Sequence, residues 1–450
     1  MREARLGDVV ASMKNGMYKP ATEYADSGIP CLRMYNIDSG SIVWRDIKRM
    51  KVTPQEYMDY GLHEGDLLVN RVNSRELVGK AAVIPASLEP SVFESKNIRV
   101  RLDTSKALPK FINYQLLARG SKHFANNAQQ VVGMASISQG QLADFPIVIT
   151  GLGEQREIVA ELEKQFSRLD EAVANLQRVK ANLKRYKASV LKAAVEGRLV
   201  ETEATLARRE GRTYETGEQL LQRILEARRV KSKGSSMLGV APPLGEMPSI
   251  PEGWVWTSLG QCFRVAVGAT PSRKEATYWN GDVPWVSSGE VKLGRIRHTE
   301  EHISAAGLAN SSTRINPAGS VMIGMIGQGR TRGQAAILDI DAANNQNCAA
   351  IWVSHTDVPP EFVFNWLLSR YTETRSEGSG NNQQALNKRL VEQIPLPLPP
   401  LAEQVRIVVE VDRHLSIIRE VEAEVDANHQ RAQALRQSIL QRSFSTGRHD

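Results

Sequence analysis

Two segments of the chain combine arginine, lysine and amide side chains in a way that suits binding to a polyanion. The segment VNRVNSRELVGK, residues 69–80, carries Asn70, Arg71, Asn73, Arg75 and Lys80. The segment GQGRTRG, residues 327–333, carries Gln328, Arg330 and Arg332, and a later loop, SEGSGNNQQALNKR, carries Asn381 and Asn382. Arg, Asn and Gln match the edges of guanine and adenine, and Lys and further Arg match phosphates. We expect these residues to contact nucleic acid; the alternative is a solvated hairpin tip, which accounts for most loops of this kind.

The same kind of segment occurs twice because much of the sequence is repeated. Four pairs of segments recur in one order along the chain: EGDLLVNR and AGSVMIGM, GKAAVI and GQAAIL, FINYQLL and FVFNWLL, and GEQREIV and AEQVRIV. A single match of this length arises by chance, whereas several in the same order indicate an internal duplication. We therefore expect two similar domains, each ending in a similar junction.

The composition is that of a globular protein with excess positive charge. Hydrophobic residues make up 41% and charged residues 24%, and the formal net charge of +7 weakly favours a polyanionic partner. No apolar run is long enough to span a bilayer and no secretory signal is visible, so we expect a cytoplasmic protein that makes no membrane contact. Cys31, Cys262 and Cys348 lie far apart in the sequence and are expected to be reduced thiols.

The sequence carries no recognised catalytic motif. It lacks a G-x-x-x-x-G-K-[ST] phosphate loop, an [ND]-P-P-[FY] segment of an amino-methyltransferase, an H-E-x-x-H metal motif and a nucleophile elbow. We therefore expect no catalytic residue, no metal and no cofactor in this chain. Two other interpretations stay open: an enzyme whose site has no recognised motif, and a bridging protein without sequence preference.

Two kinds of element must position these segments. Short apolar runs broken by Gly, Pro, Asn and Ser fill about the first 150 residues of each half and predict strands with a few helices. The next stretch of about 45 residues in each half lacks proline and has apolar residues at helical spacing. The predicted fold is α+β, with globular domains at 1–152 and 251–400, long helices at 153–200 and 401–450, and a helix with a basic linker at 201–250.

Each long helix carries an apolar stripe whose steps are mostly three and four residues, which is typical of a coiled-coil seam. The predicted seam residues are Ile158, Leu162, Leu169, Val173, Leu176 and Leu183 in the first helix and Ile407, Val411, Leu415, Ile418, Val425 and Leu435 in the second. Because the helices have similar lengths and lie half a chain apart, we expect them to form an antiparallel coiled coil. The alternative is that each amphipathic helix packs only on its own domain.

Four segments taken together resemble the specificity subunit of a Type I restriction-modification system: PEGWVWTSLG, GATPSRKEATYWNGDVPWVSSGEV, IPLPLPPLAEQVRIV and SVLKAAVEGRLV. The resemblance covers nearly the whole chain, and the duplicated order of domain, junction and long helix is its most specific part. The first copy departs from the pattern, because it starts at RLGDVV without the PEGW lead-in and lacks the proline run at its junction.

This resemblance implies a non-catalytic DNA-reading subunit with an internal pseudo-twofold organisation. Each globular domain would be a target recognition domain for one half of a split, asymmetric site in double-stranded DNA, and the paired helices would set the spacer length. Two methyltransferase subunits and the restriction subunits would bind this scaffold, and S-adenosylmethionine, ATP and Mg²⁺ would belong to those partners. We expect Glu154, Gln155, Glu403 and Gln404 to start the long helices and to meet the methyltransferase.

Overall fold

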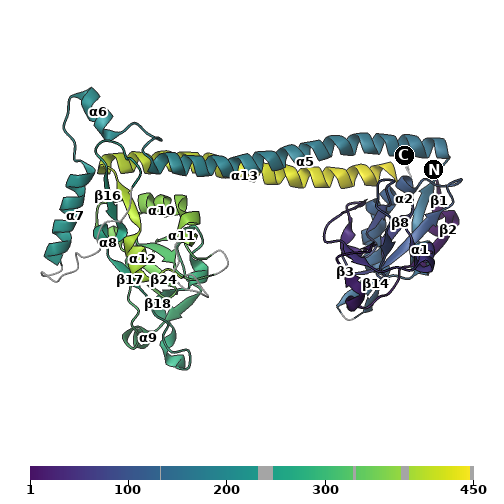
Figure 1. Cartoon of the computed structure of the whole chain (residues 1–450), viewed down its shortest axis with the longest axis horizontal. Helices are drawn as coiled ribbons and strands as arrows, with labels where there is room; N and C mark the ends of the chain where they lie inside the picture. The colour runs from purple at the N-terminus through teal and green to yellow at the C-terminus, as the bar shows by residue number, and fades with distance from the viewer. Residues whose placement is uncertain (132, 232–246, 328–330, 377–384, 446–450) are drawn as a thin grey trace, which may run out of the picture. The chain divides into compact units, whose positions relative to one another are not determined.

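The computed structural model describes residues 1–131, 133–231, 247–327, 331–376 and 385–445 (Figure 1). The chain divides into two compact units: unit 1 is formed by the described residues of 1–178 and 425–450, and unit 2 by those of 179–424. Each unit contains one copy of the duplicated sequence. The two long helices, α5 (Leu152–Val195) and α13 (Leu401–Ser443), each contribute one part to unit 1 and the other part to unit 2.

Unit 1 consists of short strands with a few helices. Its strands are β1 (Arg2–Arg5), β2 (Val10–Asn15), β3 (Tyr24–Ala25), β4 (Ile29–Leu32), β5 (Ile37–Asp38), β6 (Ser41–Ile42), β7 (Lys48–Met50), β8 (Leu67–Asn70), β9 (Val72–Asn73), β10 (Ala81–Val83), β11 (Val92–Phe93), β12 (Asn97–Leu102), β13 (Gln129–Val131), β14 (Met134–Ser136) and β15 (Pro146–Ile149). Its helices before α5 are η1 (Leu6–Val9), η2 (Ala21–Glu23), η3 (Met34–Asn36), α1 (Pro54–Tyr60), α2 (Pro109–Gln115), η4 (Leu116–Gly120), α3 (Ser121–Asn127) and α4 (Gln139–Ala143). The main sheet has the order β10-β8-β12-β2 with antiparallel neighbours, and a second sheet has the order β11-β4-β7-β3.

Unit 2 repeats this plan with additions. Its strands are β16 (Val255–Ser258), β17 (Val265–Val267), β18 (Trp279–Val286), β19 (Gly294–Ile296), β20 (Glu301–Ile303), β21 (Val321–Gly324), β22 (Ala335–Leu338), β23 (Ala343–Asn344), β24 (Cys348–Ile351) and β25 (Pro395–Leu398). Its helices between α5 and α13 are α6 (Glu203–Glu210), α7 (Gly217–Lys231), α8 (Leu259–Cys262), η5 (Ala276–Tyr278), η6 (Ser288–Glu290), α9 (Ala305–Ala309), η7 (Val353–His355), α10 (Pro360–Ser369), α11 (Tyr371–Ser376) and α12 (Lys388–Gln393). The main sheet has the order β17-β24-β21-β22-β19. Its first four strands correspond to β2, β12, β8 and β10 of unit 1, and β19 is added at the edge.

The central strand of each main sheet is buried on both faces. All four residues of β8, which reads LLVN, and all four of β21, which reads VMIG, are buried. Leu67 and Val69 of β8 belong to one core cluster and Leu68 to another. In β21, Met322 belongs to a different core cluster from Val321 and Ile323. A strand covered on both faces needs a continuous apolar run rather than an alternating one. The repeated apolar segments therefore form the centre of each domain.

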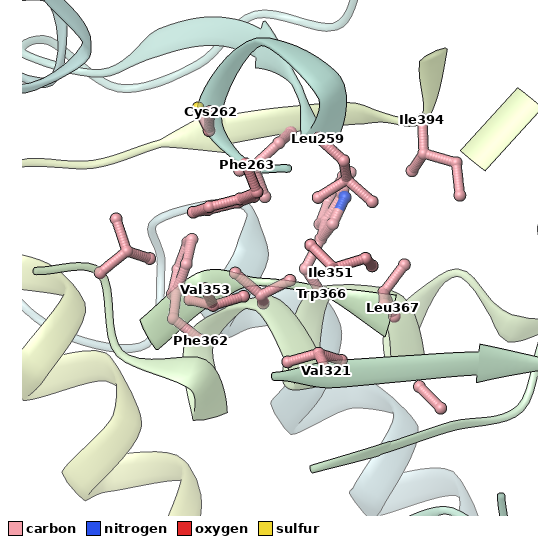
Figure 2. Close-up of a cluster of buried hydrophobic side chains, with 14 of the residues drawn as sticks. Leu259, Cys262, Phe263, Val321, Ile351, Val353, Phe362, Trp366, Leu367 and Ile394 are labelled. Carbon is pink, nitrogen blue, oxygen red and sulfur yellow. The ribbon is translucent and has the colours of Figure 1, made fainter. Parts of the chain in front are cut away.

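The largest core cluster of unit 2 lies between its main sheet and the helices that cover it. Figure 2 shows Phe362 and Trp366 of α10 near Val321 and Ile351 of the sheet, together with Phe263, which follows α8. All five side chains are buried. Large aromatic side chains bury much apolar surface, so this contact holds α10 and α8 firmly on the sheet. The sheet in turn carries the polar loops at its ends.

Within unit 1, the beginning of α5 and the end of α13 pack against each other and against the domain. Phe166 of α5, Leu440 of α13 and Phe444, which follows α13, are buried in one core cluster. Arg436 of α13 pairs with Asp170 of α5, and its guanidinium lies 4.4 Å from the ring centre of Phe166. The two helices are therefore joined by apolar burial and by the ion pair between Arg436 and Asp170.

The predicted seam is wrong at Leu435, whose side chain is 50% exposed. Arg436 takes the facing position instead, because its apolar stem and planar guanidinium cover Phe166 while its charge reaches α5. The stripe continues through Ile439 and Leu440. The apolar pattern of the sequence does not indicate that Arg436 replaces Leu435 in the seam, because arginine is a polar residue. Among the other predicted seam residues, the structure buries Leu162, Ile407, Val411, Leu415, Ile418 and Val425 and half-buries Ile158, Leu169, Val173, Leu176 and Leu183.

Within unit 2, the end of α5 and the beginning of α13 also pack together. The Tyr186 hydroxyl and Nδ1 of His414 lie 2.9 Å apart, and Leu183 packs on the cluster that contains Val411. Further along, the Glu201 carbonyl accepts a hydrogen bond from Arg406 at 3.4 Å. Residue numbers rise on one segment while they fall on the other, so the two segments are antiparallel in this unit.

The glutamines of the repeated Glu-Gln pairs are fully buried at the beginning of the long helices. The Gln155 Oε1 accepts a hydrogen bond from Leu108 N, and its Nε2 donates to the Lys106 carbonyl, both at 2.9 Å. The Gln404 Nε2 donates to the Pro399 carbonyl at 2.9 Å. These side chains fasten the first turn of each helix to its domain. The expectation that they meet a methyltransferase is therefore wrong for both glutamines.

Candidate nucleic-acid interface

Two polar segments that are separate in the sequence form one small sheet in unit 1. Strands β9, β13 and β14 pair in the order β13-β14-β9. Ile137 extends this pairing, because its N–H donates to the Arg71 carbonyl at 3.0 Å. We call the three strands the polar ribbon, and its polar residues are Asn73, Gln129, Gln130 and Ser136. The ribbon brings residues 129–136 beside the arginine-bearing segment 69–80.

Asn70 is a structural residue, and its predicted contact with nucleic acid is wrong. Its side chain is fully buried at the end of β8. Its amide donates to Oδ1 of Asn97 at 2.6 Å, and its own Oδ1 accepts a hydrogen bond from Asn73. Buried amides need such partners because an unpaired polar group inside a domain is costly. The sequence pattern did not reveal this role, since it depends on the central place of β8 in the sheet.

The other predicted residues of this segment reach the surface to different degrees. Arg75 is exposed, and its Nε donates to a backbone carbonyl at 2.9 Å. Arg71, Asn73 and Lys80 are half-buried. Lys80 lies 3.7 Å from Asp38, a weak contact that leaves its charge available. Arg71, Arg75 and Lys80 thus place three cations beside the polar ribbon.

A basic cavity lies next to the polar ribbon. It has a volume of about 440 Å³, and its lining includes Tyr18, Arg33, Lys48, Glu94 and Lys96. Lys96 connects it to the ribbon, because its carbonyl accepts a hydrogen bond from the Arg71 N–H at 2.8 Å. Tyr18 is 82% exposed and presents its ring to solvent. Cations beside an exposed ring are suited to a phosphate and to an unstacked base.

The basic cavity could not be predicted from the sequence because its cations come from segments that lie far apart in it. Arg33 follows β4, Lys48 begins β7 and Lys96 precedes β12. The second sheet brings the first two together, since Cys31 of β4 pairs with Lys48 of β7. The only local signal is a basic residue placed directly after a short apolar strand, as Arg33 is. That signal is too common to identify a site on its own.

Burial controls the titratable groups behind the basic cavity. It raises the pKa of Glu94, whose Oε1 also accepts a hydrogen bond from Met34 N at 2.9 Å. It raises the pKa of Cys31 to about 12 and moves the pKa of Tyr24 well above its usual range. Cys31 and Tyr24 are therefore neutral at physiological pH. The charge of the cavity comes mainly from its lysines and arginine.

Unit 2 closes its β21–β22 hairpin with the backbone hydrogen bonds that close β8–β10. In unit 1 the Gly79 N–H donates to the Asn70 carbonyl at 2.9 Å, and in unit 2 the Gly333 N–H donates to the Gly324 carbonyl at 2.8 Å. Gly79 and Gly333 have φ of 85° and 78°, a left-handed conformation that glycine adopts at low cost. We call residues 67–83 and 321–338 the tip hairpins. Their backbones are closed in the same way.

The contacts beside the tip hairpins are also repeated. The Met325 N–H donates to the Asn347 carbonyl at 2.8 Å, as Arg71 does to Lys96. The Leu386 N–H donates to the Met325 carbonyl at 2.9 Å, which matches the bond from Ile137 in unit 1. Leu386 therefore contacts the second tip hairpin as Ile137 contacts the first. The side chains at matching positions are different.

Most of the residues predicted at the second tip lie outside the described residues: Gln328, Arg330, Asn381 and Asn382. Arg332 is described and is half-buried next to Gly333 in the tip hairpin. Arg332 thus lies between β21 and β22, in the tip hairpin of unit 2.

Unit 2 has an aromatic site where unit 1 has its basic cavity. The guanidinium of Arg273 lies 3.7 Å from the ring centre of Trp279 and 5.4 Å from that of Trp285, and it pairs with Glu301. Residues 268–273 follow β17 as residues 16–21 follow β2 in unit 1. A guanidinium stacked on indole rings is a rigid polar group with an apolar base. The two units therefore offer different chemistry at matching positions.

Reactive thiols and metal ligands do not form a site in the part of the chain that the structure describes. Cys31, Cys262 and Cys348 are free and buried. Burial raises the pKa of Cys262 and of Cys348 to about 12, which keeps both as thiols. Among the described residues, no cluster of His, Cys, Asp or Glu could hold a metal, and no helix is long and apolar enough to cross a membrane.

Both copies of the duplicated sequence match the model of a known family. The model of the Type I restriction modification DNA specificity domain matches residues 1–184 and 251–427. The chain belongs to this family. The two matches of the specificity domain coincide with the two copies of the duplicated sequence, consistent with two domains.

Curated specificity subunits of Type I restriction enzymes are similar in sequence. The putative MjaX specificity subunit of Methanocaldococcus jannaschii is 23% identical over 412 residues, which cover 89% of this chain and 83% of that protein. The EcoBI specificity subunit of Escherichia coli is 24% identical over 97% of this chain and 84% of its own length. The match to the EcoR124I/EcoR124II specificity subunit of Escherichia coli, at 25% identity, covers 37% of this chain and less than half, 43%, of that protein.

Solved structures of specificity subunits share the fold. A chain from a structure that describes complex assembly and conformational transition of the type I R-M system has a TM-score of 0.68 at 17% identity, with 99% of this chain and 97% of that chain covered. The HsdS subunit of Thermoanaerobacter tengcongensis has a TM-score of 0.52 at 16% identity, with 98% and 96% covered. The fold of the specificity subunit is thus retained where little of the sequence is.

Proposed function

We propose that this chain is a non-catalytic reader of a split, asymmetric site in double-stranded DNA, with one half-site read by residues 1–152 and the other by residues 251–400. The family assignment supports DNA recognition. The observation that carries the proposal is the repeated tip hairpin, whose backbone hydrogen bonds are the same in both units while the side chains around it differ. The same backbone arrangement with two different sets of side chains is suited to the recognition of two different half-sites.

Different parts of unit 1 would do different work on DNA. Arg71, Arg75 and Asn73 lie on or beside the polar ribbon and would read base edges, because arginine and amide groups form paired hydrogen bonds with guanine and adenine. Lys48 and Lys96 at the basic cavity would neutralise phosphates and supply salt-dependent affinity. In unit 2 the stacked Arg273 and the second tip hairpin would take the corresponding roles.

We further propose that α5 and α13 form an antiparallel coiled coil that sets the spacer between the half-sites. The packing of Phe166 with Leu440 in unit 1 and of Tyr186 with His414 in unit 2 supports this pairing. Packed helices hold an orientation that a flexible linker would lose. Methyltransferase and restriction subunits would bind this scaffold in the cytoplasm and would hold S-adenosylmethionine, ATP and Mg²⁺, and the assembled complex named for a structural relative supports such partners.

Selection from DNA of random sequence tests the reading function. The purified chain, assembled with its methyltransferase subunit, is incubated with random duplexes at fixed salt, and the bound duplexes are sequenced. We expect two short conserved blocks separated by a spacer of fixed length and no preference within it. A single unsplit block, or no enrichment, would contradict the proposal.

A matched pair of insertions tests the ruler. Seven residues inserted in the middle of both α5 and α13 add about 10 Å to each helix, which equals roughly three base pairs of DNA. We expect a spacer longer by about that amount and unchanged half-sites. Insertion in α5 alone is the control, and it should abolish binding because the two seams no longer match. An unchanged spacer in the double insertion refutes the ruler.

A further inference from the structure

The basic cavity of unit 1 contains a group that a phosphate site does not need. Besides Arg33, Lys48 and Lys96, its lining includes the carboxylate of Glu94. Glu94 Oε1 accepts a hydrogen bond from Met34 N, whereas Oε2 has no hydrogen-bond partner among the described residues. A carboxylate oxygen accepts hydrogen bonds and repels a phosphate. A ligand that uses the whole cavity must therefore offer N–H donors as well as acceptors.

The cations of the basic cavity have donors to spare. Within the residues that the structure describes, Lys48 and Lys96 form no ion pair and no side-chain hydrogen bond, and the Arg33 side chain donates only to the Asp46 carbonyl, at 3.2 Å. Burial raises the pKa of Glu94, while its bond to the Met34 N–H and the charges of Lys96 and Arg33 lower it. The free acceptor therefore lies among free donors.

Backbone hydrogen bonds hold the floor and the rim of the basic cavity together. The Met17 N–H donates to the Phe93 carbonyl at 3.0 Å, and the Ser95 N–H donates to the Met17 carbonyl at 2.8 Å. These bonds fix Tyr18, at the rim, relative to Glu94 before any ligand arrives, which lowers the entropic cost of binding. The cavity volume of about 440 Å³ lies within the range of small-ligand sites, roughly 300–1,000 Å³.

Unit 2 has the same backbone frame. The Glu94 N–H donates to the Leu32 carbonyl, and the Asn345 N–H donates to the Val286 carbonyl, both at 3.0 Å. Strand β11 pairs parallel with β4 as β23 pairs parallel with β18. Asn345 is therefore the counterpart of Glu94, and an amide in unit 2 replaces the carboxylate of unit 1.

Unit 2 satisfies its charges at this place within the chain. Cys31 pairs with Lys48 across the strands as Trp285 pairs with Glu301, so Glu301 stands at the position of Lys48. Glu301 forms an ion pair with Arg273, whose guanidinium lies 5.4 Å from the ring centre of Trp285. A large ring and an internal ion pair thus take the place of a small thiol and a free lysine.

The rim differs in the same sense. Thr270 follows Ala269 as Tyr18 follows Met17, and its hydroxyl donates to Oε1 of Gln346 at 2.6 Å. Among the described contacts of unit 1, no side-chain hydrogen bond joins Tyr18 to Ser95, the counterpart of Gln346. One frame is thus closed by its own side chains in unit 2, and in unit 1 it presents free donors, a free acceptor and an exposed ring. This difference indicates that unit 1 binds a ligand here.

Guanine matches these groups better than the other bases do. Its O6 and N7 accept hydrogen bonds from arginine or lysine. Its N1–H and its amino group are neighbouring donors, which one carboxylate can accept together. In a base pair both donors are bonded to cytosine, so only an unpaired guanine presents them. The exposed ring of Tyr18 suits the face of such a base, and lysine suits its phosphate.

We propose that the basic cavity of unit 1 binds one unpaired guanine nucleotide. Glu94 accepts from N1–H and the amino group, Arg33 donates to the O6 and N7 edge, and Tyr18 covers the face of the base. Lys48 and Lys96 bind the phosphate. The nucleotide is either extruded from a bound duplex or free in solution. The inference deepens the proposed function and, for the extruded source, rests on it.

Titration calorimetry of the full chain with deoxynucleoside monophosphates tests the site. We expect saturable binding of dGMP with one site per chain. Deoxyinosine monophosphate keeps O6 and N1–H but lacks the amino group, and it should bind about tenfold more weakly because one hydrogen bond to a charged group is lost. Equal affinities for dGMP, deoxyinosine monophosphate and inorganic phosphate would show a plain phosphate site and overturn the inference, as would the absence of saturable dGMP binding.

Glu94→Gln is the sharpest variant, because it keeps the oxygen that accepts from Met34 N and removes the carboxylate. It should reduce the affinity for dGMP about tenfold and should change the affinity for deoxyinosine monophosphate less. Glu89→Gln is the matched control, since Glu89 is a glutamate of unit 1 that pairs with Arg49 and lies outside the cavity lining. It should leave both affinities unchanged. A wild-type preference for dGMP in the Glu94→Gln chain overturns the assignment.

Two duplexes distinguish the sources of the nucleotide. One contains a single unpaired guanine, and the other has the same sequence fully paired. An extruded nucleotide predicts that the duplex with the unpaired guanine binds about fivefold more tightly, since the cost of unpairing is already met, and that Glu94→Gln removes this advantage. Equal binding of the two duplexes, together with selective binding of dGMP, assigns the site to a free nucleotide.

The same protein separates this inference from the proposed function. A chain that selects a split site from random duplexes but shows no selective dGMP binding contradicts the nucleotide site and leaves the reading function standing. A chain that binds dGMP as predicted but selects no split site contradicts the reading function and leaves the nucleotide site standing.

Discussion

Unit 1 and unit 2 close their tip hairpins with the same backbone hydrogen bonds, yet they fill the space behind them differently. In unit 1 the buried amides of Asn70 and Asn97 bond to each other at 2.6 Å. In unit 2 Gly324 and Cys348 pair at the corresponding point of the sheet. Backbone bonds do not depend on side-chain type, so the hairpin survives while its side chains change. A duplicated reader can in this way acquire two sequence preferences without a change of fold.

The two junctions, where each domain meets its long helix, also differ. Here unit 2 has buried polar contacts that unit 1 does not have. Glu403 is fully buried and accepts hydrogen bonds from Trp254 Nε1 at 2.9 Å and from Glu203 N at 2.8 Å. Glu154 at the same position of the first copy is exposed and bonds only to Thr150 among the described contacts. Trp254 belongs to the PEGW segment at the beginning of the second copy. The repeated glutamate therefore has a structural role in unit 2 and little in unit 1, whereas the glutamine is buried in both.

The largest expected effect tests whether the ends of the two long helices are equivalent. Leu440 in unit 1 and Leu191 in unit 2 are each 4% exposed. Leu440→Ala and Leu191→Ala should each cost about 2–5 kcal/mol in the unit that contains the residue, because each leaves a cavity. Hydrogen exchange followed by mass spectrometry gives the two units separately. Leu435→Ala is the exposed control and should change the free energy of unfolding by less than about 0.5 kcal/mol.

The next effect should separate the two junctions. Glu403→Ala leaves Trp254 Nε1 and Glu203 N buried without an acceptor, and we expect unit 2 to lose about 2–4 kcal/mol. Glu154→Ala should cost less than about 0.5 kcal/mol in unit 1. Tryptophan fluorescence during urea unfolding reports mainly on unit 2, because Trp44 is the sole tryptophan of unit 1. Equal losses for the two variants would show that the junctions are alike after all.

A smaller effect should show that Asn70 is structural. Asn70→Ala removes one partner of the amide pair and should destabilise unit 1 by about 1–3 kcal/mol. The double variant Asn70→Gly with Asn97→Cys copies the residues of unit 2, and it should lose less than the sum of its two single variants. Hydrogen exchange of unit 1 measures both. Additive losses would mean that the two amides do not depend on each other.

The smallest effect concerns phosphates. Lys48→Ala should weaken binding to all duplexes alike and should lower the slope of log affinity against log salt by about 0.9. Affinity measured at several salt concentrations on a selected and an unrelated duplex checks both statements. A change in preferred sequence, with the salt slope unchanged, would place Lys48 among the base-reading residues instead.

Sequence analysis was most reliable where a physical period repeats over many residues. The helical period of α5 and α13 persists over 44 and 43 residues, and the duplication is carried by apolar strands that both cores require. It failed at single positions whose surroundings come from distant segments. Asn70 is buried because β8 lies inside the sheet, and Arg436 replaces Leu435 because a ring on α5 receives its guanidinium.

The candidate site shows the same division. Arg71, Arg75 and Arg332 could be proposed from their place in two repeated hairpins. The basic cavity could not, because Arg33, Lys48 and Lys96 become neighbours only through the second sheet and the turn before β12. The residue types along one segment do not indicate which distant segments lie beside it in the fold.

Selection from random duplexes, repeated with Arg71→Ala and with Arg332→Ala, tests the central claim most directly. If each unit reads its own half-site, Arg71→Ala should relax one block of the split motif, at about 1–3 kcal/mol for each lost base contact, and should leave the other block intact. Arg332→Ala should do the reverse. Relaxation of both blocks by either variant would contradict two independent readers.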